Sequence, residues 1–176
     1  TDAGDYLNLQ NGVLRIDRDG VRKLPHDPKY LFTSVLDYDY DPDAACPVWE
    51  VVVDRVMCGD AATVAAFQEA MGYLMLRRSN FEKMIGFVGE GENGKSTVLR
   101  TLKMLVGRSG YSAQPIKVLV KDSSEGQYAR AALAGKLINL TNELTPASLE
   151  ADAFKDLISG EDITARAIYG APFVLA

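Results

Sequence analysis

The fold is indicated by a single stretch, Gly89-Glu90-Gly91-Glu92-Asn93-Gly94-Lys95-Ser96-Thr97. It fits the pattern G-x-x-x-x-G-K-[ST], which describes a phosphate-binding loop between a strand and a helix. The flanking residues agree with this context. The apolar run over 84–88 predicts a buried strand, and the apolar residues between Ser96 and Val106 cluster on one helical face. Strand, glycine-rich turn and helix follow one another in the order that the motif requires.

The residue types of this stretch suit a polyphosphate. Glycines let the backbone bend so that successive N–H groups point at phosphate oxygens, and the N-terminus of the following helix adds partial positive charge. Lys95 is predicted to reach the β- and γ-phosphates of ATP, and the Ser96 hydroxyl to bind Mg²⁺. All nine residues are therefore candidate nucleotide-binding residues. The alternative is a turn that binds nothing, but a lysine after Gly94 has no obvious use in packing.

A second candidate site residue follows the run Lys136-Leu137-Ile138-Asn139-Leu140-Thr141-Asn142-Glu143. This apolar run ends in a carboxylate and predicts a second strand beside the loop. Strand ends beside such a loop are where ligand-binding groups lie in parallel α/β sheets. Glu143 is predicted to be the catalytic base beside Lys95 and, through water, a partner of Mg²⁺ together with Ser96. The alternative is a solvated glutamate at a strand end.

Length and composition limit the other possibilities. The 176 residues suffice for one domain with a small appendage, and the net charge of −5 makes the whole surface a poor polyanion binder. Any contact with nucleic acid then needs a local basic patch or a ring of subunits. A single histidine and two cysteines argue against a histidine-rich zinc site, a Ser-His-Asp triad and a disulfide framework. No apolar run approaches the length of a transmembrane helix, so no membrane partner is expected.

The chain divides, by its pattern, into a lead-in region over 1–79 and a P-loop core over 80–176. The lead-in region is predicted to hold short strands around an Asn11-Gly12 turn and then a pair of helices, the second capped by Asp60. The core is predicted to end in a helix over 149–159 and a hairpin with its tip at Tyr169-Gly170. Residues 172–176 read as a strand that has just begun, so we expect a piece of a longer protein.

Several motifs, in this order and at short spacing, resemble the superfamily-three helicases, in particular the poxvirus and phage-plasmid primase-helicase ATPases. The loop resembles the Walker A element of that family, and Thr141-Asn142-Glu143 resembles its Walker B end. The other matching pieces are Asn11-Gly12-Val13-Leu14, Leu24-Pro25-His26-Asp27-Pro28, Tyr40-Asp41-Pro42-Asp43-Ala44, Gln68-Glu69-Ala70-Met71-Gly72-Tyr73, and Phe154-Lys155-Asp156-Leu157-Ile158-Ser159-Gly160-Glu161-Asp162 followed by Thr164-Ala165-Arg166.

The resemblance implies an α/β fold, a P-loop NTPase core of the AAA type with a parallel sheet flanked by helices. It also implies assembly as a hexameric ring around DNA, with Lys155, Arg166 and Tyr169 as the DNA contacts. Lysine and arginine suit backbone phosphates, and an aromatic ring at a loop tip suits a base. The alternatives are that Lys155 is solvated and that Arg166 pairs with Glu161 or Asp162.

The function predicted on these grounds is the ATP-binding and hydrolysing core of a DNA helicase from a phage or mobile element. It would couple MgATP turnover to movement on DNA in the cytoplasm of a bacterial host. The family's sensor asparagine and arginine finger are expected beyond Ala176, so this piece is expected to be weakly active or inactive. Two alternatives stay open, a different P-loop enzyme such as a small-molecule kinase and a non-catalytic module that assembles on nucleotide.

Overall fold

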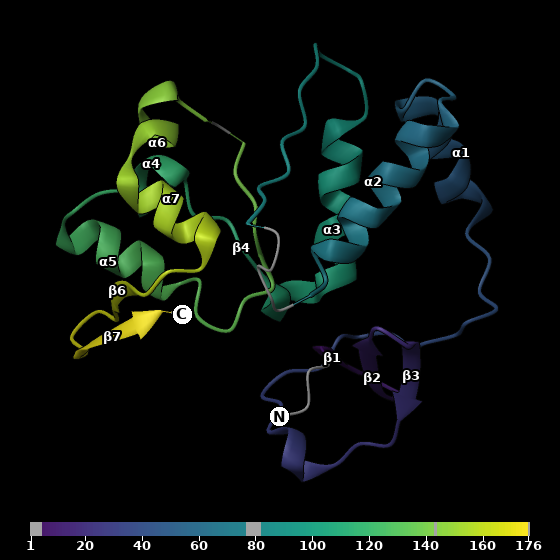
Figure 1. Cartoon of the computed structure of the whole chain (residues 1–176), viewed down its shortest axis with the longest axis horizontal. Coiled ribbons are helices and arrows are strands. Elements are labelled where there is room, and N and C mark those ends of the chain that lie inside the picture. Colours follow the sequence, from purple (N-terminus) through teal and green to yellow (C-terminus); the bar gives the residue numbers. More distant parts are fainter. Residues whose placement is uncertain (1–4, 77–81, 143, 176) are drawn as a thin grey trace. The chain divides into compact units, whose positions relative to one another are not determined.

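The computed structural model describes residues 5–76, 82–142 and 144–175, and the chain divides into two compact units (Figure 1). The first unit consists of Thr1–Arg77 and Phe87–Gly107, and the second of Arg78–Gly86 and Arg108–Ala176. The glycine-rich loop therefore belongs to the first unit, with the lead-in elements. The division into residues 1–79 and 80–176 stays a prediction.

The first unit begins with a three-stranded antiparallel sheet of β1 (Asp5–Leu9), β2 (Gly12–Asp17) and β3 (Gly20–Leu24) (Figure 1). The predicted hairpin is present, but its two turn residues are Gln10 and Asn11, one position earlier than Asn11-Gly12. Asn11 instead exchanges two hydrogen bonds with the backbone of Tyr40, at 2.9 and 3.0 Å. Gly12 starts β2 with φ +146°, and a Cβ there would lie 2.7 Å from the Leu24 carbonyl oxygen, so only glycine fits.

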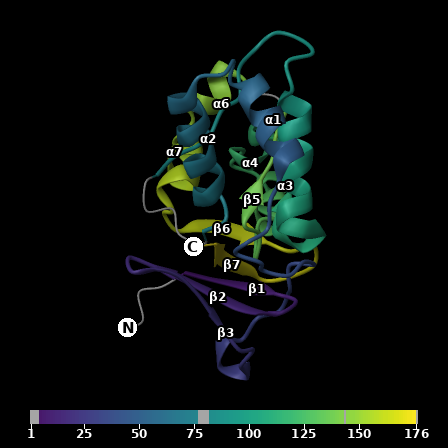
Figure 2. The ribbon, with the colours of Figure 1, turned by 90° about the vertical axis from the view of Figure 1, so that its right-hand side faces the viewer.

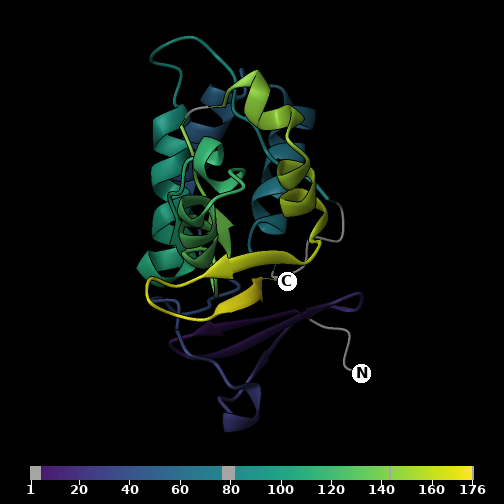
Figure 3. The same cartoon turned by 90° about the vertical axis from the view of Figure 1, so that its left-hand side faces the viewer.

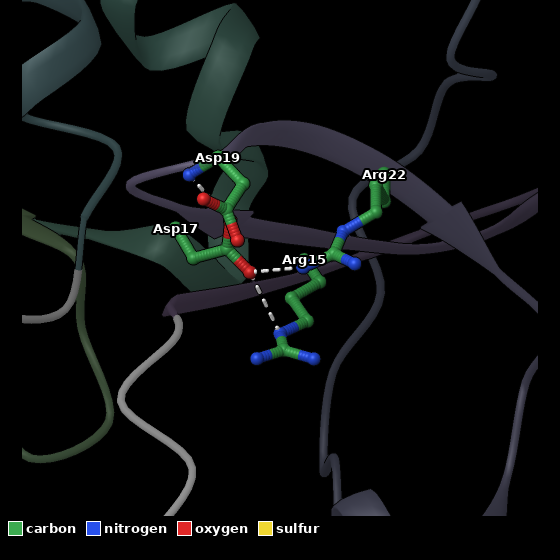
Figure 4. A network of polar contacts seen from close by, with 4 residues as sticks. All are labelled: Arg15, Asp17, Asp19 and Arg22. Atoms are coloured by element: carbon green, nitrogen blue, oxygen red, sulfur yellow. Dashed lines mark hydrogen bonds and ion pairs between the residues drawn. The ribbon is translucent and has the colours of Figure 1, made fainter.

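The turn between β2 and β3 is held by the carboxylate of Asp17 (Figure 4). It accepts hydrogen bonds from the backbone N–H of Asp19 at 3.0 Å and from Arg22 at 2.6 Å, and it pairs with Arg15 at 3.1 Å. The hydrogen bond from Arg22 lowers the pKa of Asp17 below its ordinary value. The carboxylate of Asp17 thus joins β2 to β3. A short 3₁₀ helix, η1 (Pro28–Tyr30), follows the sheet.

Helices α1 (Pro47–Val56) and α2 (Ala61–Tyr73) form the predicted helical pair and lie side by side (Figure 2). Asp60 caps α2 as predicted, accepting a hydrogen bond from the Thr63 N–H at 3.1 Å. Phe67 and Met71 of α2 are buried, so the face that carries them is a packing face. The indole of Trp49 packs against Phe67 with the ring centroids 6.2 Å apart.

Helix α3 (Lys95–Gly110) follows the loop as predicted, and Val98, Leu102 and Val106 form its buried face. Its helical conformation is interrupted at Gly107, where φ is 64° and ψ is 174°. The predicted strand over 84–88 is wrong, because these residues have no regular secondary structure and Val88 is 98% exposed. A strand is stable only beside another strand, and no described strand pairs with this run.

The second unit combines short helices with two small sheets. Strands β4 (Tyr111–Ser112) and β5 (Ile138–Asn139) pair in parallel over two residues each. Strands β6 (Ile163–Arg166) and β7 (Pro172–Leu175) form the predicted antiparallel hairpin (Figure 3). The parallel sheet of an AAA-type core stays a prediction, since β5 covers only two residues of the predicted second strand.

The helices of the second unit are α4 (Ile116–Leu119), α5 (Ser124–Ala131), α6 (Pro146–Glu150) and α7 (Asp152–Ser159). The helix predicted over 149–159 begins earlier and is divided at Ala151, whose ψ of 136° is extended. Thr145 caps the first part by accepting a hydrogen bond from the Ser148 N–H. The core of this unit is built from Ile116, Leu119 and Ala129, with Phe154 and Leu157 packed against them.

A buried arginine joins three segments of the second unit. Arg130, on α5, is only 5% exposed. Its Nε donates to the carbonyl oxygen of Thr164 on β6 at 2.8 Å, and its guanidinium also donates to those of Leu119 at 2.8 Å and Lys121 at 3.2 Å. All three acceptors are neutral, so the side chain satisfies backbone groups rather than an opposite charge.

None of the helices in the described part of the chain has the length and apolar character that a membrane span requires.

Replacing Arg130 with methionine is expected to destabilise the second unit by about 2–4 kcal/mol, because one buried and two partly buried hydrogen bonds to carbonyl groups are lost. Chemical denaturation followed by circular dichroism measures the loss. The matched control is Arg100→Met on the exposed part of α3, which should unfold like the unchanged chain. Equal stability of the two variants would show that Arg130 does not hold the unit together.

Candidate functional site

The site is centred on the ammonium group of Lys95, at the start of α3. Its Nζ donates to the carbonyl oxygen of Gly89 at 2.6 Å, to that of Glu90 at 2.7 Å and to the Oδ1 of Asn93 at 2.7 Å. A lysine ammonium has three N–H donors, so these bonds use all of them. The side chain therefore ties the first residues of the loop to the helix that the loop precedes.

The neighbourhood of Lys95 differs from that of three other lysines of the described chain, which are paired with carboxylates. Lys29, Lys121 and Lys155 each pair with a carboxylate, at 2.9, 2.7 and 2.9 Å. The three acceptors of Lys95 are neutral, and the described residues contain no ion pair for it. Its charge is thus oriented by the loop but not neutralised, which leaves it suited to an anion.

The backbone of the loop has the bends that the glycine pattern predicts. Glu92 and Gly94 both adopt positive φ, at 59° and 87°, and such turns can present successive N–H groups to an anion. The carbonyl oxygen of Gly94 accepts hydrogen bonds from the N–H groups of Thr97 at 3.0 Å and Val98 at 3.1 Å. The first N–H groups of a helix have no partner within it and carry its partial positive charge. In α3 these groups include the N–H groups of Lys95 and Ser96.

Two glycines of the loop lie in close contact with neighbouring side chains. A Cβ at Gly89 would collide with the amide group of Asn93, and a Cβ at Gly94 would lie 2.5 Å from the Cγ2 of Val56 on α1. A side chain at either position would therefore displace a neighbour. The loop is packed tightly, and one of its contacts comes from a helix far earlier in the chain.

Donors of this kind suit the oxygens of a phosphate group, whereas Mg²⁺ needs oxygen ligands. Ser96 is exposed and offers its hydroxyl. The described residues contain no cluster of three or more His, Cys, Asp or Glu side chains that could hold a metal alone. Mg²⁺ needs no such cluster, since it usually takes one or two protein ligands, substrate phosphates and water. Glu143, the other predicted Mg²⁺ partner and the predicted base, lies outside the described residues.

The predicted DNA contacts fall on α7 and the β6–β7 hairpin, with different local settings. Tyr169, at the hairpin tip, is fully exposed and has φ 60°, and its neighbour Ile168 is 67% exposed. Arg166 is half-buried, and its Nε donates to the carbonyl oxygen of Gly170 at 2.9 Å. Among the described residues Arg166 forms no ion pair, so the alternative pairing with the preceding acidic residues is not found. The arginine instead braces the turn that carries Tyr169.

Lys155 is the weakest of the three candidates. It is exposed on α7 and pairs with Asp152 at 2.9 Å. The hydrogen bond that Lys155 donates to Asp152 raises the pKa of the lysine above its ordinary value and lowers the pKa of the carboxyl group. The lysine stays charged at physiological pH, but its charge is partly offset by its own helix.

A protein-family match covers the part of the chain that contains every predicted site residue. Residues 87–176, slightly more than half of the chain, match the family of unknown function DUF5906. The chain belongs to this family. The match includes the loop, Glu143 and the β6–β7 hairpin, so it covers the segment in which we place the site.

A second match concerns the lead-in region. Residues 1–58 match the family described as D5 N terminal like, a domain found in phage and poxvirus primase-helicase proteins. These residues comprise the N-terminal sheet and α1. A search of curated proteins found no match. The D5-like segment agrees with the family suggested by the motifs at the level of primase-helicase proteins.

Sequence reasoning missed the roles of three groups that shape the site and its surroundings. Asn93 is predicted to contact phosphate, and the structure adds that its Oδ1 accepts a hydrogen bond from Lys95. The contact of Val56 with the loop at Gly94 is not predicted by the sequence pattern. The burial of Arg130 is not predicted either, because a lone arginine on a short helix gives no local signal that it is buried. All three roles depend on contacts that the linear pattern does not encode.

Proposed function

We propose that this chain is the ATP-binding and hydrolysing core of a DNA helicase of the primase-helicase type, from a phage or mobile element in a bacterial cell. The observation that carries the proposal is Lys95, a cation held by three neutral oxygens at a helix N-terminus inside a glycine-rich loop. The D5-like lead-in region supports the same family. We include in the proposal an AAA-type P-loop fold and a hexameric ring around DNA.

In the proposed reaction, Lys95 exchanges at least one of its bonds to the loop oxygens for a bond to the β- and γ-phosphates of ATP, and the N–H groups at the start of α3 bind the same phosphates. The Ser96 hydroxyl would hold Mg²⁺, which supplies positive charge that offsets the charge developing on the phosphates. Glu143 would orient the attacking water and accept its proton as the bond from the water oxygen to the γ-phosphorus forms. The bond from the γ-phosphorus to the bridging oxygen would break in the same reaction, and that oxygen would leave with ADP. Asn93 keeps the ammonium of Lys95 within the loop without neutralising it.

Contact with DNA is proposed for the β6–β7 hairpin. Tyr169 is exposed at its tip, where its ring can stack on a base, and Arg166 fixes the turn behind it. Lys155 contributes a cation on the preceding helix. In a ring, each subunit would present one such hairpin to the strand.

Lys95→Ala is expected to weaken binding of MgATP about tenfold to a hundredfold, because one charge-assisted contact to the phosphates is lost. Isothermal titration calorimetry measures the affinity. Lys103→Ala, at an exposed position of the same helix, is the matched control and should bind like the unchanged chain. If Lys95→Ala also binds normally, the loop is not the nucleotide site.

Glu143→Gln is expected to bind MgATP with unchanged affinity and to abolish turnover, because the amide cannot accept the proton of the attacking water. Phosphate release measures turnover, and calorimetry measures affinity. Glu150→Gln, an exposed residue of α6, controls for the loss of one negative charge. Retained hydrolysis in Glu143→Gln would place the base elsewhere.

The helicase proposal is tested by ATP turnover with and without single-stranded DNA, in this chain and in a version extended past Ala176. We expect DNA to stimulate the extended version. Tyr169→Ala should remove the stimulation and weaken DNA binding about fivefold to a hundredfold, which is the range for one stacked base. Tyr128→Ala, an exposed tyrosine on α5, should change neither quantity. Turnover that ignores DNA in both versions would favour a kinase or an assembly module.

A further inference from the structure

The segment that enters the loop is packed on the lead-in helices. Phe87, two residues before Gly89, lies edge to face against Phe67 of α2, with the ring centroids 6.2 Å apart. Phe67 in turn packs against Trp49 of α1 at 6.2 Å. Phe67 is buried and the other two rings are half-buried, so the row packs onto the core of the first unit. The row fixes the point at which the chain enters the loop.

The other end of the loop contacts the same helical pair. Val56, the last residue of α1, lies so close to Gly94 that a Cβ on the glycine would be 2.5 Å from the Cγ2 of the valine. Gly94 has φ 87°, and its carbonyl oxygen accepts the first hydrogen bonds of α3. Val56 therefore contacts Gly94, whose conformation sets the direction in which α3 starts. Lys95 is the first residue of α3, so its position depends on the same glycine.

These contacts join the two segments recognised in separate families. Trp49 and Val56 belong to the D5-like match over 1–58, whereas Phe87 and Gly94 belong to the DUF5906 match over 87–176. All four residues lie in one compact unit of the structure. The lead-in helices are thus not merely attached before the loop, because they hold it at both ends.

We propose that α1 is a positioning element of the nucleotide site. Val56 holds Gly94, and the row of three rings holds the segment before Gly89, so that the loop is arranged before a ligand arrives. A site arranged in advance binds more tightly, because less ordering free energy is lost on binding. Coupling of this kind is reciprocal, so nucleotide binding in turn changes the environment of α1. This inference rests on the proposed nucleotide binding.

The chain contains its own reporter of this coupling. Trp49 is the only tryptophan and stands at one end of the row of rings. Titration with MgADP, which avoids turnover, is expected to shift its fluorescence emission. The shift should saturate with the same dissociation constant that calorimetry gives. Lys95→Ala, at the same MgADP concentrations, should leave the emission unshifted.

The variant Val56→Ala tests the contact at Gly94. Removing two methyl groups loosens the support of the glycine, and we expect MgADP binding to weaken about threefold to tenfold. Val51→Ala removes the same groups from the same helix at a position that is 68% exposed, and it should bind like the unchanged chain. Both variants are checked for folding by circular dichroism before titration.

The outcomes separate this inference from the function on which it rests. Normal affinity in Val56→Ala overturns the inference, whatever the emission does. If Val56→Ala does not fold, the unchanged chain decides: calorimetric binding without a shift in Trp49 emission overturns the inference, and binding with a matching shift supports it. If calorimetry detects no MgADP binding, it is the proposed function that has failed.

Discussion

The proposed chemistry depends above all on one positive charge, that of the Lys95 ammonium. The loop orients this charge but does not neutralise it. The ammonium of Lys95 has three hydrogen-bond partners, which satisfies its geometry, but each partner is a neutral oxygen. Carbonyl and amide dipoles stabilise a cation without cancelling its field. The N-terminus of α3 adds positive potential from the same side. An incoming polyphosphate would thus meet charge complementarity without first displacing a carboxylate, as it would at Lys155 or Lys121.

The sequence predicted well those features that depend on near neighbours in the chain. The cap at Asp60, the apolar face of α3 and the hairpin of β6 and β7 depend on residues a few positions apart, and all three are present. The strand predicted over 84–88 is absent, because an apolar run is not sufficient to form a strand. Strand pairing needs a second backbone, and no described strand provides one. The turn at Asn11 shifted by one residue because a distant backbone, that of Tyr40, uses the asparagine side chain.

The candidate site shows the same division between local and distant information. The loop motif is contiguous, so its bends and its lysine could be predicted from spacing alone. The contact of Val56 with Gly94 could not, because it joins segments separated by all of α2. This contact places part of the lead-in region against the loop, whereas the sequence pattern presents the region as an appendage. A glycine that is conformationally necessary at φ 87° is also sterically necessary because a helix from elsewhere in the chain lies against it.

Charge also constrains how an acidic chain could contact DNA. With a net charge of −5, the molecule as a whole repels a polyanion, so the contact has to be local. On the candidate surface Lys155 shares its charge with Asp152, and Arg166 uses its Nε within the hairpin turn. The group left most available is the ring of Tyr169 beside the exposed Ile168. Stacking would therefore contribute more than phosphate pairing for each subunit. Since the salt dependence of binding grows with the number of phosphates neutralised, affinity from such a tip would respond weakly to salt, and several linked copies would be needed to make it strong.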